Sequence, residues 1–355
     1  MKKLHFRFTH FAICLALLFG CSGPGNPEST TTVTDSSVST AQDSLIQTAL
    51  LDSLNARIMA TPNNPDVYKA RAEYHWLKED VIAALGDLEL GLKADSNRAD
   101  LYFAKGEIYY TTAQYDQAMA DYQKCLDKDS ENIDCLLRVA EMNVHLKQYS
   151  KAIQNVNDAL KVDDQLPLAY YMKGRIYKET GDTTLAASSY QTAIEVDPDY
   201  YDAYIEVGLL YAAAGSDLAI EYYNTALGLK PQSVEALYDL AYYKQSTGFR
   251  QPQRYQDALD LYDEILITDP KNAAAAFNQG FIYLEYLQDY QNGLKKFSKA
   301  LDLYPQYFQA YYNRGLCYES LGNTEEALKD YNRALSLKPD FTAAAIAKGR
   351  VLGEN

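Results

Sequence analysis

Side chains that could carry out catalysis are few in this chain of 355 residues, and they do not combine into a site. Beyond the first twenty residues the only histidines are His75 and His145, and neither has a cysteine or acid at metal-ligand spacing. No glycine-rich phosphate loop is present. The adjacent acids Glu325 and Glu326 fall where a helix begins, and the helix dipole favours carboxylates there. We therefore expect no enzyme activity, no metal and no cofactor.

A ladder of small residues predicts the elements that position the remaining side chains. Glycine or alanine returns at intervals of 34, 34, 34, 34, 33, 39, 35 and 34 residues, at Ala72, Gly106, Ala140, Gly174, Gly208, Ala241, Gly280, Gly315 and Gly349. Self-similarity near 34 residues predicts stacked helix-turn-helix units. Such a stack forms a long curved surface without an enclosed active site, so binding another protein is the default function.

The other positions of each unit repeat with the same period. A second small residue is followed four positions later by a bulky one, as in Ala118 with Tyr122 and Ala186 with Tyr190. Steps of three and four residues predict one packed stripe on each of two helices. Proline follows the second helix in five units, at Pro198, Pro231, Pro270, Pro305 and Pro339. Proline ends a helix because it lacks the N–H donor and clashes with the preceding turn.

This pattern resembles the tetratricopeptide repeat (TPR) family over residues 65–341, as eight units in register. The first three units depart from it, since Ser96, Ser130 and Asp164 stand where proline is usual. The resemblance implies an all-α fold, a right-handed α-solenoid superhelix of helix-turn-helix repeats with a capping helix at each end. It also implies that the chain binds proteins.

The N-terminus resembles a bacterial lipoprotein signal. Lys2, Lys3 and Arg7 precede the apolar run Phe11–Phe19, which is short for a membrane span and suits a secretory signal. The segment ends in Gly20-Cys21, like the lipoprotein processing site, which implies cleavage before Cys21 and lipid on that cysteine. Ser22 follows, and lipoprotein sorting in related systems would then favour the outer membrane. An ordinary signal peptide that ends in Gly-Cys is the alternative.

These signals divide the chain into five segments. We expect a signal peptide at 1–20, a lipidated cysteine and Ser/Thr-rich flexible tether at 21–41, a capping helix at 42–64, eight repeats at 65–341, and a second capping helix at 342–355. Lysine and arginine total 33, and aspartate and glutamate total 48. Removal of the three basic residues of the signal leaves 30 − 48 = −18, a charge that disfavours nucleic acid as a partner.

In the TPR family the first helix of each repeat lines the concave face. Carried over to this chain, the resemblance predicts a partner-binding groove lined by Trp76, Phe103, Tyr110, Tyr171, Ile205, Tyr238, Tyr242, Phe277, Phe281 and Tyr312. The N-terminal half of this face is acidic, and the C-terminal half is nearly uncharged and aromatic. Aromatic anchors of this kind suit an apolar helix or extended peptide. The alternative is that the rings pack against one another inside the superhelix, because most of the 32 tyrosines must be core.

Three features qualify this interpretation. Family members that bind a peptide's C-terminal carboxylate use lysine and asparagine on this face, but here Lys69 is nearly alone, so that clamp is absent. Cys125 and Cys317 are expected to fill core positions, and a disulfide between Cys125 and Cys135 stays open because their Cα separation cannot be read from sequence. Repeat six holds extra residues within Gly248–Asp257, predicted as a tolerated loop, with a basic docking point at Arg250 and Arg254 as the alternative.

Together these observations predict a membrane-anchored protein-interaction scaffold or adaptor of the bacterial cell envelope, with a protein partner and lipid attachment. A glycan-binding lipoprotein that uses exposed aromatic rings is the first alternative, because tyrosine and tryptophan also stack on sugars. A purely structural spacer is the second.

Overall fold

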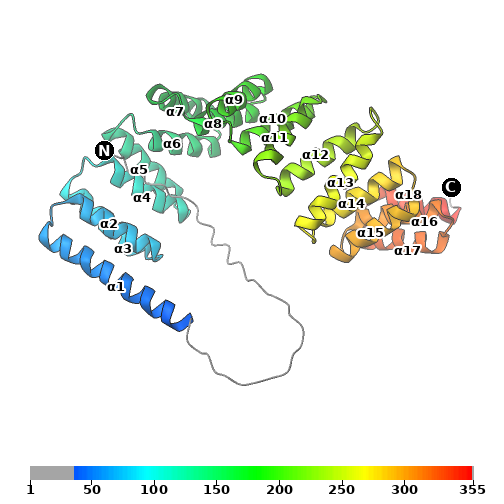
Figure 1. Cartoon of the computed structure of the whole chain (residues 1–355), viewed down its shortest axis with the longest axis horizontal. Coiled ribbons are helices and arrows are strands. Elements are labelled where there is room, and N and C mark those ends of the chain that lie inside the picture. The colour runs from blue at the N-terminus through cyan, green and yellow to red at the C-terminus, as the bar shows by residue number, and fades with distance from the viewer. Residues whose placement is uncertain (1–35, 354–355) are drawn as a thin grey trace, which may run out of the picture. The chain divides into compact units, whose positions relative to one another are not determined.

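The computed structural model describes residues 36–353, and every regular element within that range is a helix (Figure 1). The helices are α1 (Ser36–Ala60), α2 (Pro65–Leu77), α3 (Val81–Ala94), α4 (Ala99–Thr111), α5 (Tyr115–Lys128), α6 (Ile133–His145), α7 (Tyr149–Val162), α8 (Pro167–Glu179), α9 (Thr183–Val196), α10 (Tyr201–Ala213), α11 (Leu218–Leu229), α12 (Val234–Thr247), α13 (Gln253–Thr268), α14 (Ala273–Phe281), η1 (Ile282–Tyr286), α15 (Tyr290–Leu303), α16 (Phe308–Ser320), α17 (Thr324–Leu337) and α18 (Thr342–Leu352).

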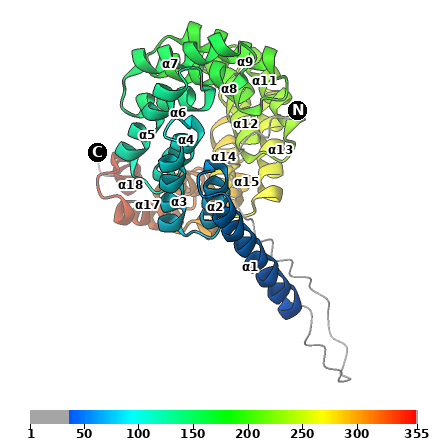
Figure 2. The same ribbon diagram turned by 90° about the vertical axis from the view of Figure 1, so that its left-hand side faces the viewer.

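Helices α2 to α17 pair in chain order into eight helix-turn-helix repeats, which confirms the predicted all-α solenoid. Each repeat lies beside the next in both views of the array (Figures 1 and 2).

Local sequence sets the boundaries of the helices. Asn64 and Asp80 accept hydrogen bonds from the backbone N–H groups at the starts of α2 and α3. Pro198 and Pro231 lie two residues beyond the ends of α9 and α11, as their inability to continue a helix predicts.

Each pair is held together by a small residue of the first helix against a large residue of the second. A Cβ added at Gly106 would lie 2.5 Å from the ring of Tyr122, and one added at Gly208 would lie 2.6 Å from the ring of Tyr223. The ladder of small residues therefore reflects contact between a backbone and a fully buried ring. Two repeats with alanine at this position carry smaller partners on the second helix, in the pairs Ala72–Leu88 and Ala140–Val156.

A disulfide joins Cys125 of α5 to Cys135 of α6, with the two Cα atoms 6.5 Å apart. The expectation that Cys125 is only a core filler is therefore wrong, and the alternative left open by the sequence holds. Both cysteines are fully buried and link repeat two to repeat three across the turn. Cys317 is a buried free thiol as expected, and burial raises its pKa to about 12.

The first described helix differs from the boundaries expected for the N-terminal capping helix by a few residues. Helix α1 forms a unit by itself, and it runs over Ser36–Ala60 rather than 42–64. Residues 36–41, expected in the tether, are helical because a helix extends over serine, threonine and alanine at little cost once it is nucleated. Pro65 starts α2 at the position where proline is preferred. At the other end α18 packs on the last repeat through Ala347 and Tyr331.

No helix within residues 36–353 is long and apolar enough to cross a membrane. The expected signal peptide (1–20), the lipidated Cys21 and the first part of the tether lie outside the described residues.

Candidate functional site

The ten residues of the predicted groove all lie on first helices of repeats, from Trp76 on α2 to Tyr312 on α16. They differ in accessibility. Tyr242 is 56% exposed and Ile205 only 4%, while the other eight are half-buried. Ile205 packs in the core with Tyr201 and Tyr223, so it is not available to a partner. An isoleucine has no polar tip that must reach water, whereas a tyrosine at the same position keeps its hydroxyl near the surface.

Five of these rings pack on the buried ring of their own repeat's second helix. The pairs, with their centroid separations, are Phe103–Tyr122 (6.0 Å), Tyr171–Tyr190 (5.5 Å), Tyr238–Tyr262 (5.9 Å), Phe277–Phe297 (5.5 Å) and Tyr312–Tyr331 (6.0 Å). These separations are typical of tilted and edge-to-face pairs. Each of these five rings is thus fixed by the core, while part of it remains accessible to solvent.

In the N-terminal half, the acids of this face are paired with bases, several of them from a neighbouring repeat. The bridges are Lys69–Asp100 (2.6 Å), Arg138–Glu107 (2.8 Å), Arg138–Glu141 (2.8 Å) and Lys178–Glu206 (2.6 Å). Burial alone would raise the pKa of Asp100, but hydrogen bonds from Arg98 and Lys69 outweigh it and lower that pKa to about 2. The acidic character predicted here is therefore largely neutralised within the array.

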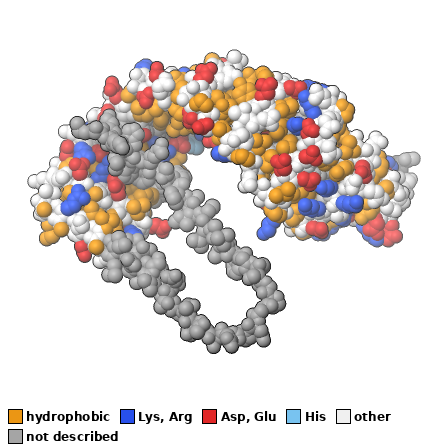
Figure 3. Space-filling view, in the orientation of Figure 1, with side chains coloured by type: hydrophobic (Ala, Val, Ile, Leu, Met, Phe, Trp, Pro, Cys, Tyr) orange, Lys and Arg blue, Asp and Glu red, His pale blue; other side chains and the backbone are white. Residues whose placement is uncertain are grey.

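The C-terminal half carries a continuous group of rings, which we call the aromatic patch: Tyr238, Tyr242, Phe277, Phe281, Tyr286 and Tyr307. Tyr238 and Tyr242 stack on α12 with centroids 6.5 Å apart. Phe277 stacks on Tyr307 at 4.7 Å, and Phe281 meets Tyr286 edge-on at 5.9 Å. Hydrophobic side chains reach the surface among acidic and basic ones along the repeats (Figure 3).

The two sides of the aromatic patch belong to adjacent repeats and lie close together. Burial raises the pKa of Tyr307, and the nearby phenol of Tyr238 adds to the rise. In the same way, burial raises the pKa of Tyr286, with a smaller contribution from Tyr242. Asn278 of α14 donates a hydrogen bond to the Tyr238 hydroxyl at 3.0 Å, so the rings of repeat six adjoin repeat seven.

Two members of the aromatic patch, Tyr286 and Tyr307, were not predicted. Tyr286 belongs to η1, a π-helical turn that stacks its ring on Tyr255 with centroids 4.4 Å apart. A signal for this turn exists in the sequence: Gly280 and Gly293 are 13 residues apart, one more than the equivalent small residues of the next repeat. A π-turn absorbs one extra residue. Tyr307 lies in the turn before α16, and turn residues do not belong to the predicted set of first-helix positions.

Two carboxylates, Glu235 and Asp239, lie on α12 beside Tyr238 and Tyr242 of the aromatic patch, and Glu206 of α10 lies near Asp239. Burial raises the pKa of Asp239 to about 6, and Glu235 and Glu206 add to the effect. Glu235, Asp239 and Tyr242 are spaced i, i+4 and i+7, so they share one face of α12. The acids and the rings therefore form one surface.

An open pocket of about 610 Å³ adjoins Glu235, lined by Tyr201, Lys230, Pro231, Gln232, Ser233 and Glu235. Its polar groups bind one another. The Tyr201 hydroxyl lies 2.5 Å from the Ser233 hydroxyl and donates to Glu235 at 3.4 Å, while the Lys230 ammonium lies 3.7 Å from the centroid of the Tyr201 ring.

Comparison with known proteins agrees with this architecture. Models of the tetratricopeptide repeat match residues 99–132, 171–234 and 308–341. The chain belongs to the tetratricopeptide repeat family. Repeats of this family mediate protein–protein interaction.

Curated relatives of this TPR chain resemble its repeats. Human tetratricopeptide repeat protein 6 is 26% identical over 176 residues, which cover 47% of this chain and 31% of the relative. The human mitochondrial import receptor subunit TOM70 is 24% identical over 206 residues, covering 48% and 34%. The chain spans about a third of the length of these relatives. The C-terminal part of a TPR repeat-containing protein from Cytophaga hutchinsonii has the same fold, with a TM-score of 0.52 and 22% identity over 64% of this chain and 93% of that structure.

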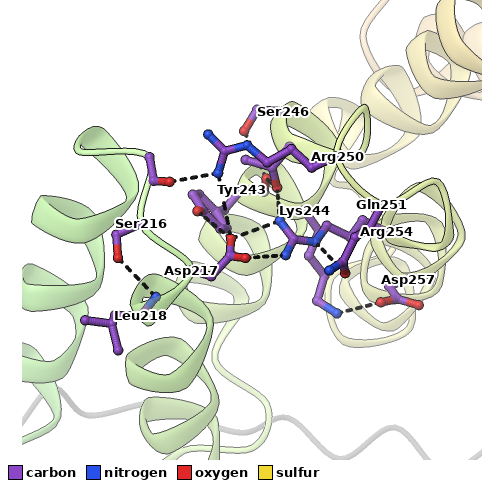
Figure 4. Close-up of polar contacts among 12 residues, drawn as sticks. Ser216, Asp217, Leu218, Tyr243, Lys244, Ser246, Arg250, Gln251, Arg254 and Asp257 are labelled. Carbon is purple, nitrogen blue, oxygen red and sulfur yellow. Dashed lines mark hydrogen bonds and ion pairs between the residues drawn. The ribbon is translucent and has the colours of Figure 1, made fainter.

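The insertion in repeat six of this TPR array is tied to repeat five (Figure 4). Arg254 has only 6% of its side chain exposed, and it donates two hydrogen bonds to Asp217 at 3.0 and 2.7 Å. Arg250 donates to the carbonyl oxygen of Gly215 at 2.8 Å. Because both arginines serve contacts between repeats, the alternative of a free basic docking point is not supported.

The described part of this TPR chain holds no group of three His, Cys, Asp or Glu residues placed to bind a metal ion. His75 is half-buried on α2, with its Nε2 atom 3.7 Å from Asp87 and its ring edge-on to Tyr74. His145 is exposed at the end of α6.

Proposed function

We propose that this protein is a lipid-anchored scaffold or adaptor of the bacterial cell envelope, held in the outer membrane through Cys21, that binds a partner protein on its aromatic patch. The accessible rings of the patch carry this proposal. Tyr242 is 56% and Tyr286 41% exposed, on rings fixed by their neighbours. Rigid, contiguous aromatic surface is typical of interaction sites and of binding hot spots.

Two further observations support the envelope location. The Gly20-Cys21 sequence follows a basic segment and an apolar run, as in lipoprotein signals. The disulfide between Cys125 and Cys135 suits an oxidising compartment, since disulfides are rare in the cytosol. Binding rather than catalysis fits a face whose conspicuous groups are aromatic rings, and the only free cysteine among the described residues is buried.

The proposal is tested by affinity purification of the crosslinked lipoprotein from its own cells, followed by mass spectrometry. Tyr242→Ser removes the most exposed ring of the aromatic patch, and Ile267→Ser serves as the control because Ile267 is 79% exposed on the second helix of the same repeat. We expect a protein partner that is lost only with Tyr242→Ser. Identical partner sets in both variants would leave the aromatic patch without a binding role and place partner binding on another face, and the absence of any partner would favour the structural spacer.

A further inference from the structure

We propose that the partner segment carries a lysine or arginine beside large apolar side chains, with the cation seated between Glu235 and Asp239 and the apolar side chains on the aromatic patch. This inference rests on the proposed function and adds the chemical class of the segment that is bound.

The geometry of α12 places both halves of the binding surface on one helix face. Glu235 and Asp239 are four residues apart, and Tyr238 and Tyr242 follow them by three residues each. Side chains at these spacings are neighbours, with Cβ atoms about 5–6 Å apart. A ligand that inserts an apolar side chain beside Tyr242 therefore brings its adjacent residue within reach of the two carboxylates.

The contrast with the other repeats shows why a cation is expected here. Arg138 bridges Glu107 and Glu141, and comparable bridges continue along the face as far as Lys178 and Glu206. That series is interrupted at repeat six, and within residues 36–353 a pair of the same kind returns only at Glu319 and Arg350. No lysine or arginine of the described residues forms an ion pair with Glu235 or Asp239, and the one hydrogen bond to Glu235 comes from the Tyr201 phenol.

The groups around Asp239 come from three helices. Glu206 faces it from α10, Tyr223 from α11, and Glu235 from its own helix, while Lys178 is occupied by Glu206 and Lys230 lies over the Tyr201 ring. Burial and these like charges hold the pKa of Asp239 near 6. A cation from a partner would favour the ionised carboxylate, whereas an anionic segment would be repelled.

Matched synthetic peptides test the inference on the full-length lipoprotein in detergent. The peptides share the same apolar residues at helical spacing and differ at one adjacent position, which is arginine, glutamine or glutamate. We expect the arginine peptide to bind about tenfold more tightly than the glutamine peptide, and the glutamate peptide to bind most weakly, in fluorescence anisotropy. The preference for arginine should decline as the pH falls through about 6, because Asp239 becomes protonated.

Two double variants make the test specific. Glu235→Gln with Asp239→Asn should abolish the preference for arginine over glutamine. Asp260→Asn with Glu264→Gln removes the same charges from exposed positions of α13 and should keep the preference. Equal affinity for arginine and glutamate peptides, or a preference that survives in the first double variant, would overturn the inference.

The outcome is separable from that of the proposed function. If all three peptides bind equally and Tyr242→Ser abolishes their binding, the aromatic patch remains a binding site and only the cation inference fails. If no peptide binds, the cation inference also fails, and the crosslinked partners of the Tyr242→Ser variant decide the proposed function on their own.

Discussion

Asp239 is a residue at which binding and stability are expected to oppose each other. Its pKa is about 6 in the folded protein, above the value near 4 of an unfolded chain. The folded state therefore prefers the protonated form, so the free energy of unfolding falls as the pH rises through the window from about 4 to 6 and stays lower above it. An acid kept at a stability cost is typical of a functional position.

Replacing this acid should stabilise the protein at neutral pH. Asp239→Asn is expected to raise the free energy of unfolding by about 1–2 kcal/mol at pH 7.5, after allowance for solvent screening of a half-buried group, and to change it little at pH 4. Urea unfolding followed by circular dichroism at both pH values measures this. The exposed Asp260→Asn is the control. Equal stability of Asp239→Asn and the native protein at pH 7.5 would show that the ionised Asp239 does not destabilise the fold.

Two glycines on adjacent helices make a matched test of packing. A Cβ at Gly208 would lie 2.6 Å from the buried Tyr223 ring, whereas nothing lies within 4 Å of a Cβ at Gly228. Gly208→Ala should lower the free energy of unfolding by about 1–3 kcal/mol through overpacking. Gly228→Ala should raise it by about 0.5–1 kcal/mol, because alanine favours helix more than glycine does. Thermal unfolding of both variants measures this, and a shift of the same sign in both would contradict the role of Gly208.

For single residues, the sequence predicts which side chains pack together better than it predicts how exposed each side chain is. The positions of Gly106, Gly174 and Gly208 follow from periodicity because each repeat must close a small residue onto a ring. The burial of Ile205 does not follow, since the same helical position is half-buried when it carries Tyr171 or Tyr238. The size of a side chain and the presence of a polar tip decide how much of it is exposed. The periodicity of small residues gives information on neither property.

Among the elements, the insertion of repeat six acts as a tie between repeats. Asp217 at the start of α11 accepts hydrogen bonds from Arg254 and from the Tyr243 phenol at 3.0 Å. The hydrogen bond from Arg254 is the main cause that lowers the pKa of Asp217. The ionised Asp217 therefore stabilises the fold at neutral pH, and this stabilisation is lost as the pH falls below about 4.

Removal of this carboxylate should loosen the junction between repeats five and six. Asp217→Ala leaves the buried Arg254 with weaker partners and is expected to cost about 1–2 kcal/mol, less than a fully buried pair because Asp217 is half exposed. Thermal unfolding at pH 7.5, with Asp260→Ala as the control, provides the measurement. If both variants unfold at the same temperature, the insertion is a tolerated loop without a structural role.

The sequence predicts the helices of this protein but not the contacts between its repeats. Eight helix pairs follow from the small-residue ladder, and η1 follows from the single extra residue between Gly280 and Gly293 once it is noticed. The disulfide does not follow, because Cys125 and Cys135 lie on different helices and their separation depends on how repeats two and three pack. The ion pairs between repeats do not follow from the sequence either, because they also depend on how neighbouring repeats pack.

For the molecule as a whole, the proposed anchor has a direct test. Cys21→Ser removes the side chain that would carry lipid, and two-phase detergent partitioning and membrane fractionation of cells should then find the protein in the soluble fraction. A loss of at least about tenfold in membrane association is expected, because acyl chains supply most of the membrane affinity of such an anchor. Continued membrane association of the variant would contradict lipid attachment at this residue.

The central claim, that the aromatic patch binds a partner protein, is tested most directly by photo-crosslinking in living cells. A photoreactive phenylalanine analogue is placed at Tyr242, and in a second strain at Ile267, which is 79% exposed on α13. Irradiation should give a discrete protein adduct from position 242 and none from position 267. The absence of an adduct at 242, or the same adduct from both positions, would contradict the claim.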